Sequence, residues 1–350
     1  MRVVIATPLY PPQIGGPATY AHLLSTALPS RGIAVHVIAY SEVCALPKYI
    51  RHFAYYRRVR RAARQADLIL ALDPVSVGLP ALWAARRQRI PLVLKVGGDY
   101  AWEQGQQRFG VTEGLDEFIR THKVAFPVVI LRRVQSYVAR GAARIITPSE
   151  YLRRVVCTWG VAPANVSVIY NAVAPTKIGH VPEAVDELAR PRVVTAGRLV
   201  PWKNIDCIID AVATTRDLTL VVVGDGPERA RLEQHARPLR RRVLFTGALS
   251  HDDTLATIQT ADIFVLNSSY EGLSHLLVEA LMLGVPTVAT RAGGNEEVLT
   301  HDTHGVLVPV GDTAALAAAL IAAPPPTTMS NTTFTEEKMV ALTIDLLTAL

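Results

Sequence analysis

Short, continuous apolar runs alternate with helical stretches along the whole chain. The runs are rich in valine and isoleucine and apolar on both faces, which predicts strands of parallel sheets that are covered on both sides. The helical stretches between them predict an α/β fold. The runs are VVIATP (3–8), VHVIAY (35–40), DLILAL (67–72), PLVLKV (91–96), ARIITPS (143–149) and VSVIYN (166–171), then RVVTAG (192–197), LTLVVVG (218–224), RVLFTG (242–247), DIFVLN (262–267), PTVAT (286–290) and GVLVPV (305–310).

The runs fall into two sets, separated by a segment at 172–191 that lacks strand periodicity and carries three prolines. With 350 residues the chain is long enough for two domains. We therefore predict two Rossmann-like domains facing a cleft, at 1–172 and 192–334, joined by a linker at 173–191. A final helix at 335–350 either closes the second domain or crosses back to the first.

The net charge of +6 is concentrated in one segment, 48–64, which contains seven basic residues and no acid. Its aromatic and apolar residues recur at spacings of three and four, which predicts an amphipathic helix. Such a helix either lies on an anionic membrane or packs its aromatics inward and leaves its arginines in solvent. No recognised nucleic-acid motif accompanies the charge, so nucleic acid is not an expected partner.

The three cysteines, at 44, 157 and 207, are too scattered for a disulfide framework or a zinc site. The chain begins on a strand without a signal peptide, and no apolar run approaches the roughly 20 residues needed to cross a bilayer. We expect a cytoplasmic protein that touches a membrane only peripherally, on its inner face.

The segment EGLSHLLVE (271–279) holds two glutamates eight positions apart. Ser274 is a good helix N-cap, so we predict that Glu271 lies in the loop before a helix and that Glu279 lies about one turn inside it. Free backbone N–H groups at a helix start attract anions. With two carboxylates nearby, the segment suits a ligand that carries both phosphate and hydroxyls, such as a nucleotide sugar.

Other loops after predicted strands carry glycines or cations. Gly15 and Gly16 precede a predicted helix, and Arg198 and Lys203 form a pair of cations that favours a diphosphate. Each loop taken alone also fits an ordinary turn or surface charge. VGDGP (223–227) contains only part of a dinucleotide fingerprint, because Arg229 stands where its third glycine should be.

Together these loops resemble the motifs of the retaining GT-B glycosyltransferases of the E-x7-E group, the family 4 or group 1 type, which transfer sugars from nucleotide donors. The resemblance covers nearly the whole chain and is strongest from 192 to 312. The motifs are GGP (15–17), GRLVPWKN (197–204), VGDGP (223–227), FTG (245–247), EGLSHLLVEA (271–280) and GG–E (293–296).

The resemblance implies a role for each matching residue. Arg198 and Lys203 would hold the donor diphosphate, Glu279 would bond the ribose hydroxyls, and Glu271 would lie beside the donor sugar. The segment after Phe245 would form the nucleobase pocket. The predicted donor-binding residues are Gly15, Gly16, Gly224, Gly247, Gly272, Leu273, Ser274, His275, Leu276 and Glu279, and the predicted catalytic residues are Arg198, Lys203, Glu271 and Asp99.

The acceptor side matches the family less well. Asp99 follows the fourth strand, where relatives often have histidine, and is our candidate for an acceptor contact or base; alternatively it caps the helix that begins at Tyr100. His122 is a second candidate, with a solvated helix histidine as its alternative. His275 either reads the donor sugar or merely faces the cleft.

The resemblance implies that the sugar's anomeric configuration is retained by same-face attack. The departing phosphate oxygen would accept the acceptor's proton. A double displacement with Glu271 as nucleophile is the alternative. No D-x-D metal clamp is present in the sequence, so we expect no metal or cofactor beyond a UDP- or GDP-linked donor. The expected acceptor is a hydroxyl of a lipid-linked glycan or a cell-envelope or exopolysaccharide precursor.

Two functions of other classes remain open. A catalytically idle nucleotide-sugar-binding protein would keep Arg198, Lys203 and Glu279 but would not need Glu271. A nicotinamide oxidoreductase would need a complete G-x-G-x-x-G with an acid about 20 residues on, which neither half supplies.

Overall fold

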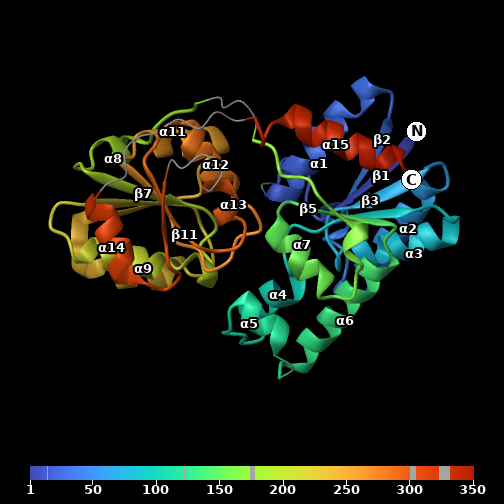
Figure 1. The fold of residues 1–350 in the computed structure, drawn as a ribbon, viewed down its shortest axis with the longest axis horizontal. Helices are drawn as coiled ribbons and strands as arrows, with labels where there is room; N and C mark the ends of the chain where they lie inside the picture. The colour runs from blue at the N-terminus through green and yellow to red at the C-terminus, as the bar shows by residue number, and fades with distance from the viewer. Residues whose placement is uncertain (14, 122, 174–177, 300–304, 323–331) are drawn as a thin grey trace. The chain divides into compact units, whose positions relative to one another are not determined.

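The structure is a computed structural model that describes residues 1–13, 15–121, 123–173, 178–299, 305–322 and 332–350. The chain divides into two compact units. The first unit is Met1–Asn171 together with Glu336–Leu350, and the second is Ala172–Thr335. The last helix, α15 (Glu336–Thr348), therefore belongs to the first unit, where it lies beside α1 (Gly16–Ala27) (Figure 1).

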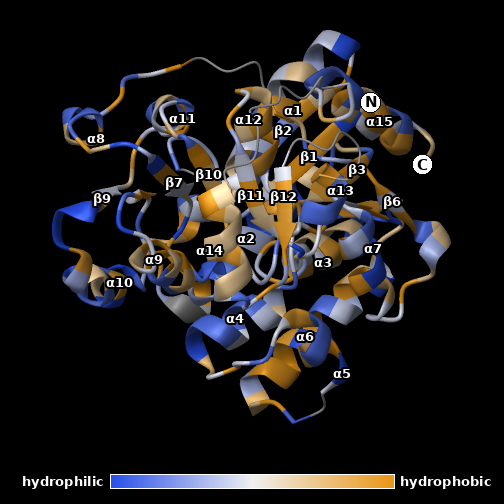
Figure 2. Ribbon diagram, turned by 60° about the vertical axis from the view of Figure 1, so that its left-hand side comes forward, coloured by the Kyte–Doolittle hydropathy of each residue, from blue (hydrophilic) through white to orange (hydrophobic). Residues whose placement is uncertain are grey.

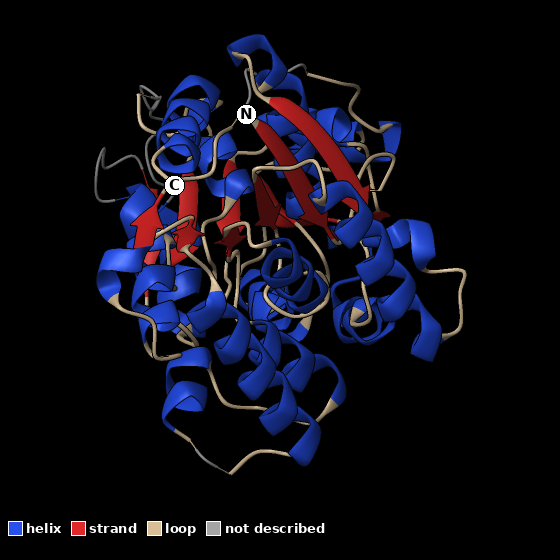
Figure 3. Ribbon diagram, turned by 90° about the vertical axis from the view of Figure 1, so that its right-hand side faces the viewer, coloured by secondary structure: helices blue, strands red, loops and turns tan. Residues whose placement is uncertain are grey.

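Each of the twelve predicted apolar runs forms a strand, and both sheets are parallel throughout. In the first unit the strands (red) lie between helices (blue), which explains why its runs are apolar on both faces (Figure 3). The first sheet has the order β2-β1-β3-β4-β5-β6 and the second the order β12-β11-β10-β7-β8-β9. The strands are β1 (Arg2–Thr7), β2 (Ala34–Ala39), β3 (Leu68–Ala71), β4 (Leu92–Lys95), β5 (Arg144–Thr147), β6 (Val166–Val168), β7 (Arg192–Ala196), β8 (Thr219–Val223), β9 (Val243–Gly247), β10 (Ile263–Leu266), β11 (Thr287–Thr290) and β12 (Gly305–Val308).

The helices occupy the connections between these strands. In the first unit they are α1, α2 (Lys48–Ala63), α3 (Gly78–Gln88), α4 (Tyr100–Arg108), α5 (Leu115–Arg120), α6 (Phe126–Gly141), α7 (Glu150–Cys157) and α15. In the second they are α8 (Glu183–Asp186), α9 (Ile205–Ala213), α10 (Arg229–Ala236), α11 (His251–Gln259), α12 (His275–Met282), α13 (Asn295–Leu299) and α14 (Thr313–Ala322). Short 3-10 turns are η1 (Pro29–Arg31), η2 (Tyr40–Val43), η3 (Pro163–Asn165), η4 (Pro201–Lys203) and η5 (Arg237–Arg242).

The core of the second unit lies under α9 and α14. Ile208 of α9 and Leu320 of α14 pack with Leu220 and Val265 of the sheet, and all four are buried. In Figure 2, β10 is coloured as hydrophobic and the surface helix α10 as mainly hydrophilic, as expected for a strand covered on both faces and a helix covered on one.

The predicted helix at 48–64 is α2, but its apolar side chains do not share one face. Tyr55 and Val59 are fully buried, whereas Ile50 and Phe53 are 52% and 59% exposed. Of the apolar residues whose spacing predicted this helix, Val59 is buried and Tyr56 is half-buried, but Ile50 and Phe53 face solvent, and Tyr55 takes a buried position instead. Among the described residues, no helix combines the length and apolarity needed to span a membrane.

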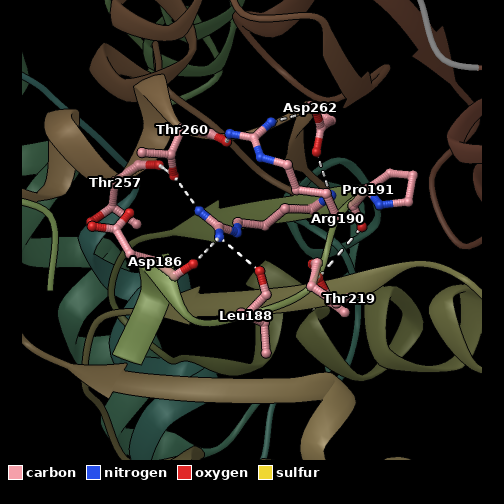
Figure 4. A network of polar contacts seen from close by, with 10 residues as sticks. Asp186, Leu188, Arg190, Pro191, Thr219, Thr257, Thr260 and Asp262 are labelled. Atoms are coloured by element: carbon pink, nitrogen blue, oxygen red, sulfur yellow. Dashed lines mark hydrogen bonds and ion pairs between the residues drawn. The ribbon is translucent and has the colours of Figure 1, made fainter. Parts of the chain in front are cut away.

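The chain around residue 190 is held to the second unit by two arginines. Arg190 pairs with Asp262 and donates to the carbonyl of Thr260 (2.7 and 2.8 Å; Figure 4). The buried guanidinium of Arg192 donates to the carbonyl of Leu188 and to the hydroxyl of Thr260 (2.8 and 3.0 Å). The end of the segment predicted as a linker thus packs at the start of β7.

Candidate active site

Two loops lie side by side at the topological switch point of the second sheet. β7 and β10 are neighbours there, and the chain continues from them in opposite directions, to β8 and to β11. Ligands of open α/β sheets bind outside the carboxyl ends of the strands at such a point. The loops that follow these strands, 197–204 and 267–274, are therefore where a binding site is expected.

Hydrogen bonds tie these two loops together. The side-chain amide of Asn204 donates to the carbonyl of Asn267 (3.2 Å), and that of Asn267 donates back to the carbonyl of Asn204 (3.0 Å). The backbone amide of Ser269 donates to the carbonyl of Trp202 at 2.8 Å. The bonds on both sides of Lys203 fix its position against the second loop.

Lys203 and Glu271 form an ion pair across the two loops. Lys203 Nζ lies 2.5 Å from Glu271 Oε1, and Ser268 Oγ donates to the same oxygen at 2.6 Å. The side chains of Lys203 and Glu271 are only 17% and 12% exposed, so solvent screens this pair less than a surface pair. The structure thus brings together a cation and a carboxylate that lie 68 positions apart in the sequence.

Arg198 lies at the start of the first loop and is exposed. Within the described chain, no hydrogen bond or ion pair engages its guanidinium. Together with Lys203 and Ser268 it lines a small recess at the ends of β7 and β10. Arg198 therefore offers an unengaged bidentate hydrogen-bond donor beside the Lys203–Glu271 pair.

A pair of glycines packs against the backbone of Glu271. Gly293 has φ +55°, and a Cβ there would lie 1.9 Å from the carbonyl oxygen of Glu271. A Cβ on Gly294 would lie 2.4 Å from the carbonyl oxygen of Gly272, and the amide of Gly294 donates to the carbonyl of Glu271 at 3.0 Å. The two glycines therefore allow the loop after β11 to support the Glu271 loop from close contact.

The start of α12 agrees with the prediction. Ser274 is the N-cap, and its hydroxyl accepts a hydrogen bond from the amide of Leu277 at 3.3 Å. Glu271 lies in the preceding loop, and Glu279 lies inside the helix. Of the predicted donor-binding residues here, Gly272 and Leu273 are buried, and His275 and Leu276 are half-buried.

The carboxylate of Glu279 has one engaged and one unengaged oxygen. The residue is 3% exposed, and its Oε1 lies 3.2 Å from Nε2 of His251. Its Oε2 is buried and has no hydrogen-bond partner within the described residues. A buried carboxylate oxygen without a donor is costly, which points to a ligand hydroxyl as the missing partner.

The predicted glycines of the neighbouring loops have packing roles. The amide of Gly224 donates to the carbonyl of Gly247 at 2.9 Å. Gly224 has φ +127°, and a Cβ there would lie 1.9 Å from the carbonyl oxygen of Gly197. Both glycines thus hold the carboxyl ends of β7, β8 and β9 close together, and their contact with a donor remains a prediction.

Two site residues were missed in the sequence. Ser268 was detectable, because it follows β10 at the carboxyl end of the strand, where polar residues are informative. His251 carried no comparable signal, since it begins α11 and reaches Glu279 from another helix. The hydrogen bond with Glu279 raises the pKa of His251 above its usual value of 6.5.

In the first unit, Asp99 is the N-cap of α4. Its Oδ1 accepts from the amide of Trp102 at 2.9 Å, and its Oδ2 accepts from the side-chain amide of Gln135 at 3.1 Å. Asp99 is 1% exposed, and burial raises the pKa of its carboxyl group. This geometry favours the capping alternative over a base, because both oxygens already face internal donors.

The other predicted residues of the first unit lie elsewhere. Gly15 is the N-cap of α1, and Gly16 is its first residue, where an added Cβ would meet nothing within 4 Å. His122 lies outside the described residues. Lys95, at the end of β4, is buried, and its Nζ donates to the carbonyl of Ile169 at 3.2 Å. Burial lowers the pKa of Lys95 to about 7.

Two family models match the chain, one in each half. The model described as Glycosyl transferases group 1 matches residues 183–323, and the model described as Glycosyltransferase Family 4 matches residues 14–177. Both matches include predicted site residues, among them Lys203, Glu271 and Glu279 in the first and Gly16 in the second.

Individual relatives agree with these models. The lipopolysaccharide core biosynthesis glycosyltransferase LpsD of Rhizobium meliloti is 41% identical over 128 residues, which is 36% of this chain and 37% of that protein. A GDP-mannose-dependent alpha-mannosyltransferase of Mycobacterium tuberculosis is 27% identical over 288 residues, which is 80% of this chain and 70% of that protein. The chain thus matches only part of these curated relatives.

A solved structure shares the fold over the whole chain. Anabaena HepE in complex with UDP-glucose superposes with a TM-score of 0.76 and 20% sequence identity, covering 100% of both chains. At this identity the likeness shows the fold alone, which is the two-domain α/β fold of the GT-B glycosyltransferases.

Proposed function

Because the chain belongs to the glycosyltransferases of group 1 and family 4, we propose that it is a retaining enzyme that moves a sugar from a nucleotide-diphosphate donor to a hydroxyl acceptor. The observation that carries this proposal is the cluster at the switch point of the second sheet. There Lys203 and Glu271 are paired, Arg198 is unengaged, and a buried oxygen of Glu279 lacks a partner among the described residues.

Arg198 and Lys203 would hold the diphosphate and stabilise its charge as it leaves. A guanidinium that is not engaged by the described residues can form two parallel bonds to phosphate oxygens. Preorganised cations are worth most where charge develops in the transition state. We therefore propose that the reaction needs no metal, and unchanged turnover in the presence of EDTA is the expected result.

The two glutamates would have different tasks. The unpartnered oxygen of Glu279 supports a role in accepting hydrogen bonds from the ribose. Glu271, held by Lys203 and Ser268, would lie beside the donor sugar, and the first-turn amides of α12 would meet sugar hydroxyls and phosphate. The segment after β9 would contribute to the nucleobase pocket.

We propose that the anomeric configuration is retained by attack on the same face from which the diphosphate leaves. The bond from C1 to the phosphate oxygen breaks, the bond from C1 to the acceptor oxygen forms, and the acceptor's proton passes to the departing phosphate oxygen. A double displacement through Glu271 is less favoured, because its Oε1 already accepts from an ammonium and a hydroxyl, which weakens it as a nucleophile.

The donor is proposed to be UDP- or GDP-linked, and the acceptor a lipid-linked glycan or a cell-envelope polysaccharide precursor. The similarity to a GDP-mannose-dependent enzyme and to a lipopolysaccharide core enzyme supports these classes. We also propose that Gly16, where an added Cβ would meet nothing within 4 Å, approaches a donor phosphate.

We propose a peripheral membrane contact through α2 on the cytoplasmic side. Phe53 is exposed and lies beside Arg57, whose guanidinium carbon is 5.9 Å from the ring centroid. Trp83 of α3 is 48% exposed and packs edge-on against Tyr56. Exposed aromatic rings beside arginines can bind the surface of an anionic membrane.

Flotation with vesicles containing phosphatidylglycerol tests this contact. We expect binding that weakens with salt and that Phe53→Ser abolishes, whereas Phe109→Ser, at an exposed phenylalanine of the same unit, leaves it unchanged. An equal loss of vesicle binding in both variants, or no vesicle binding by the wild type at low salt, would rule the contact out.

A panel of nucleotide sugars tests the proposed activity. We expect one donor to bind, to raise the melting temperature and to be consumed, slowly with water and faster with an acceptor. A donor that binds but is never consumed would indicate an idle binding protein. Tight NADH binding without any nucleotide-sugar binding would indicate an oxidoreductase.

A further inference from the structure

The carboxylate of Glu279 is held in one orientation by a neighbour from another helix. His251, the first residue of α11, places Nε2 3.2 Å from Glu279 Oε1. The Glu279 side chain is 4% exposed and that of His251 is 59% exposed, so a histidine at the surface reaches a buried carboxylate. The second oxygen, Oε2, is left buried and without a partner among the described residues.

This arrangement makes the two oxygens unequal. A carboxylate with two unengaged oxygens can rotate and share them among several donors, whereas one whose Oε1 is fixed presents only Oε2. The charged groups acting on the His251 ring in the described structure are Glu279 from α12 and Asp252 from its own helix. Both are acidic, which favours the protonated ring and a charge-assisted hydrogen bond to Glu279.

We propose that His251 is a positioning residue for the nucleotide donor, holding Glu279 Oε1 so that Oε2 accepts from the ribose hydroxyls. This inference rests on the proposed function, because it requires the ribose of a donor at Glu279. His251 itself makes no contact with the reacting atoms. Its effect is on donor affinity and on the discrimination between ribose and dideoxyribose.

The test compares ribonucleotides with their dideoxy counterparts in four proteins. The dissociation constants of UDP and GDP, and of their 2′,3′-dideoxy counterparts, are measured by calorimetry with wild type, His251→Ala, His251→Gln and Glu279→Gln. We expect His251→Ala to weaken binding of the better ribonucleotide about five- to tenfold, which is within the net worth of one ordinary hydrogen bond. The dideoxy nucleotide should bind the wild type and His251→Ala equally well.

Two controls separate positioning from a structural effect. His251→Gln keeps an N–H donor and should restore part of the discrimination. His235→Ala removes another histidine of the second unit, whose ring lies 2.7 Å from Asp210 Oδ1, and should change neither ligand's affinity. Melting temperatures of all variants report whether the unit is folded.

The pH dependence provides a second readout. A nucleotide sugar has no titrating phosphate between about pH 5.5 and 8.5, so changes in its affinity report on the protein. As the pH rises through the pKa of His251, the ring loses its charge, and we expect the wild type to bind the donor severalfold more weakly. His251→Gln should show a flat profile over the same range.

The outcomes distinguish this inference from the proposed function. If Glu279→Gln abolishes ribose discrimination but His251→Ala does not, the ribose assignment stands and the positioning role is wrong. If His251→Ala weakens both ligands equally, the role is likewise wrong. If no nucleotide binds the wild type, the proposed function fails and this inference fails with it.

Discussion

Lys203 Nζ lies 2.5 Å from Glu271 Oε1, at the point where the loops after β7 and β10 meet. The cation expected to bind the diphosphate is therefore already paired with the carboxylate expected beside the sugar. Donor binding would insert phosphate oxygens next to this pair, so that Lys203 is shared between two acceptors. The two side chains should therefore act together in catalysis.

The first prediction concerns the Lys203–Glu271 pair. Lys203→Met should lower kcat/KM on the order of 100-fold or more, because the leaving diphosphate loses a preorganised cation. Glu271→Gln should have a comparable effect, and the double variant should lose much less than the product of the two. Steady-state kinetics with the identified donor would check this.

Arg231→Met is the matched control for Lys203. Arg231 pairs with Glu228 and Asp206 on the surface of the second unit and does not line the recess that contains Lys203. The Arg231→Met variant should keep kcat/KM within about twofold of wild type, since surface ion pairs contribute little to stability. Strictly multiplicative losses in the Lys203 and Glu271 double variant would show that the pair does not act together.

The second prediction concerns the support of Glu271 by Gly293. Gly293→Ala should destabilise the second unit by more than Gly311→Ala. Both positions have positive φ, which costs an alanine roughly 1 kcal/mol. Only Gly293 adds a clash, since its Cβ would lie 1.9 Å from the carbonyl of Glu271, whereas nothing lies within 4 Å of a Cβ on Gly311. Urea unfolding would measure the difference, and equal losses would refute close packing.

The third prediction separates the two roles of Asp99. As an N-cap, Asp99 should be replaceable by Asn with nearly full activity, while Asp99→Ala should lose about 1 kcal/mol of stability. If Asp99 acted as a base instead, Asp99→Asn should lower kcat by orders of magnitude. Given the hydrogen bonds to Trp102 and Gln135, we expect the first result in a paired stability and activity assay.

The fourth prediction concerns the pH dependence of stability. The pKa of Lys95 is about 7 in the folded protein and near its ordinary value of 10.5 when unfolded. Between these values the unfolded chain binds a proton that the folded protein does not, so stability falls as the pH drops through this window. The penalty is fully present below about pH 7 and absent above about pH 10.5.

Lys95→Met should remove this penalty. The variant should be more stable than wild type near pH 7, on the order of several kcal/mol at most, and its advantage should shrink as the pH rises toward 10. The exposed Lys123 gives the control, because Lys123→Met should show no such pH-dependent gain. Parallel stability curves for Lys95→Met and wild type would contradict a buried, discharged lysine.

Much of the fold could be predicted because its signal is local. A strand covered on both faces, such as β8 or β10, is a continuous apolar run, and its identity does not depend on its neighbours. The order of the strands has no such local signal. The faces of α2 were mispredicted for a related reason: periodicity shows which side chains can share a face, but the buried stripe through Tyr55 and Val59 is decided by the helices that pack on it.

The candidate site was predictable where residues lie at strand ends or helix starts. Lys203, Glu271 and Ser274 all occupy such positions, so local rules and the family resemblance found them. The pairing of Lys203 with Glu271 and of His251 with Glu279 could not be predicted, because each joins residues from separate connections whose distance depends on the fold. Asp99 shows the converse, since a polar residue after a strand can be a buried cap.

The configuration of the sugar released from the donor tests the central claim most directly. The donor found in the panel is incubated with wild type and with Glu271→Gln, and the first product is observed by proton NMR before mutarotation. We predict that the wild type releases the nucleoside diphosphate and a sugar with the donor's own anomeric configuration, and that Glu271→Gln does so far more slowly. The opposite anomer, or equal rates for the two proteins, would contradict a retaining transfer at this site.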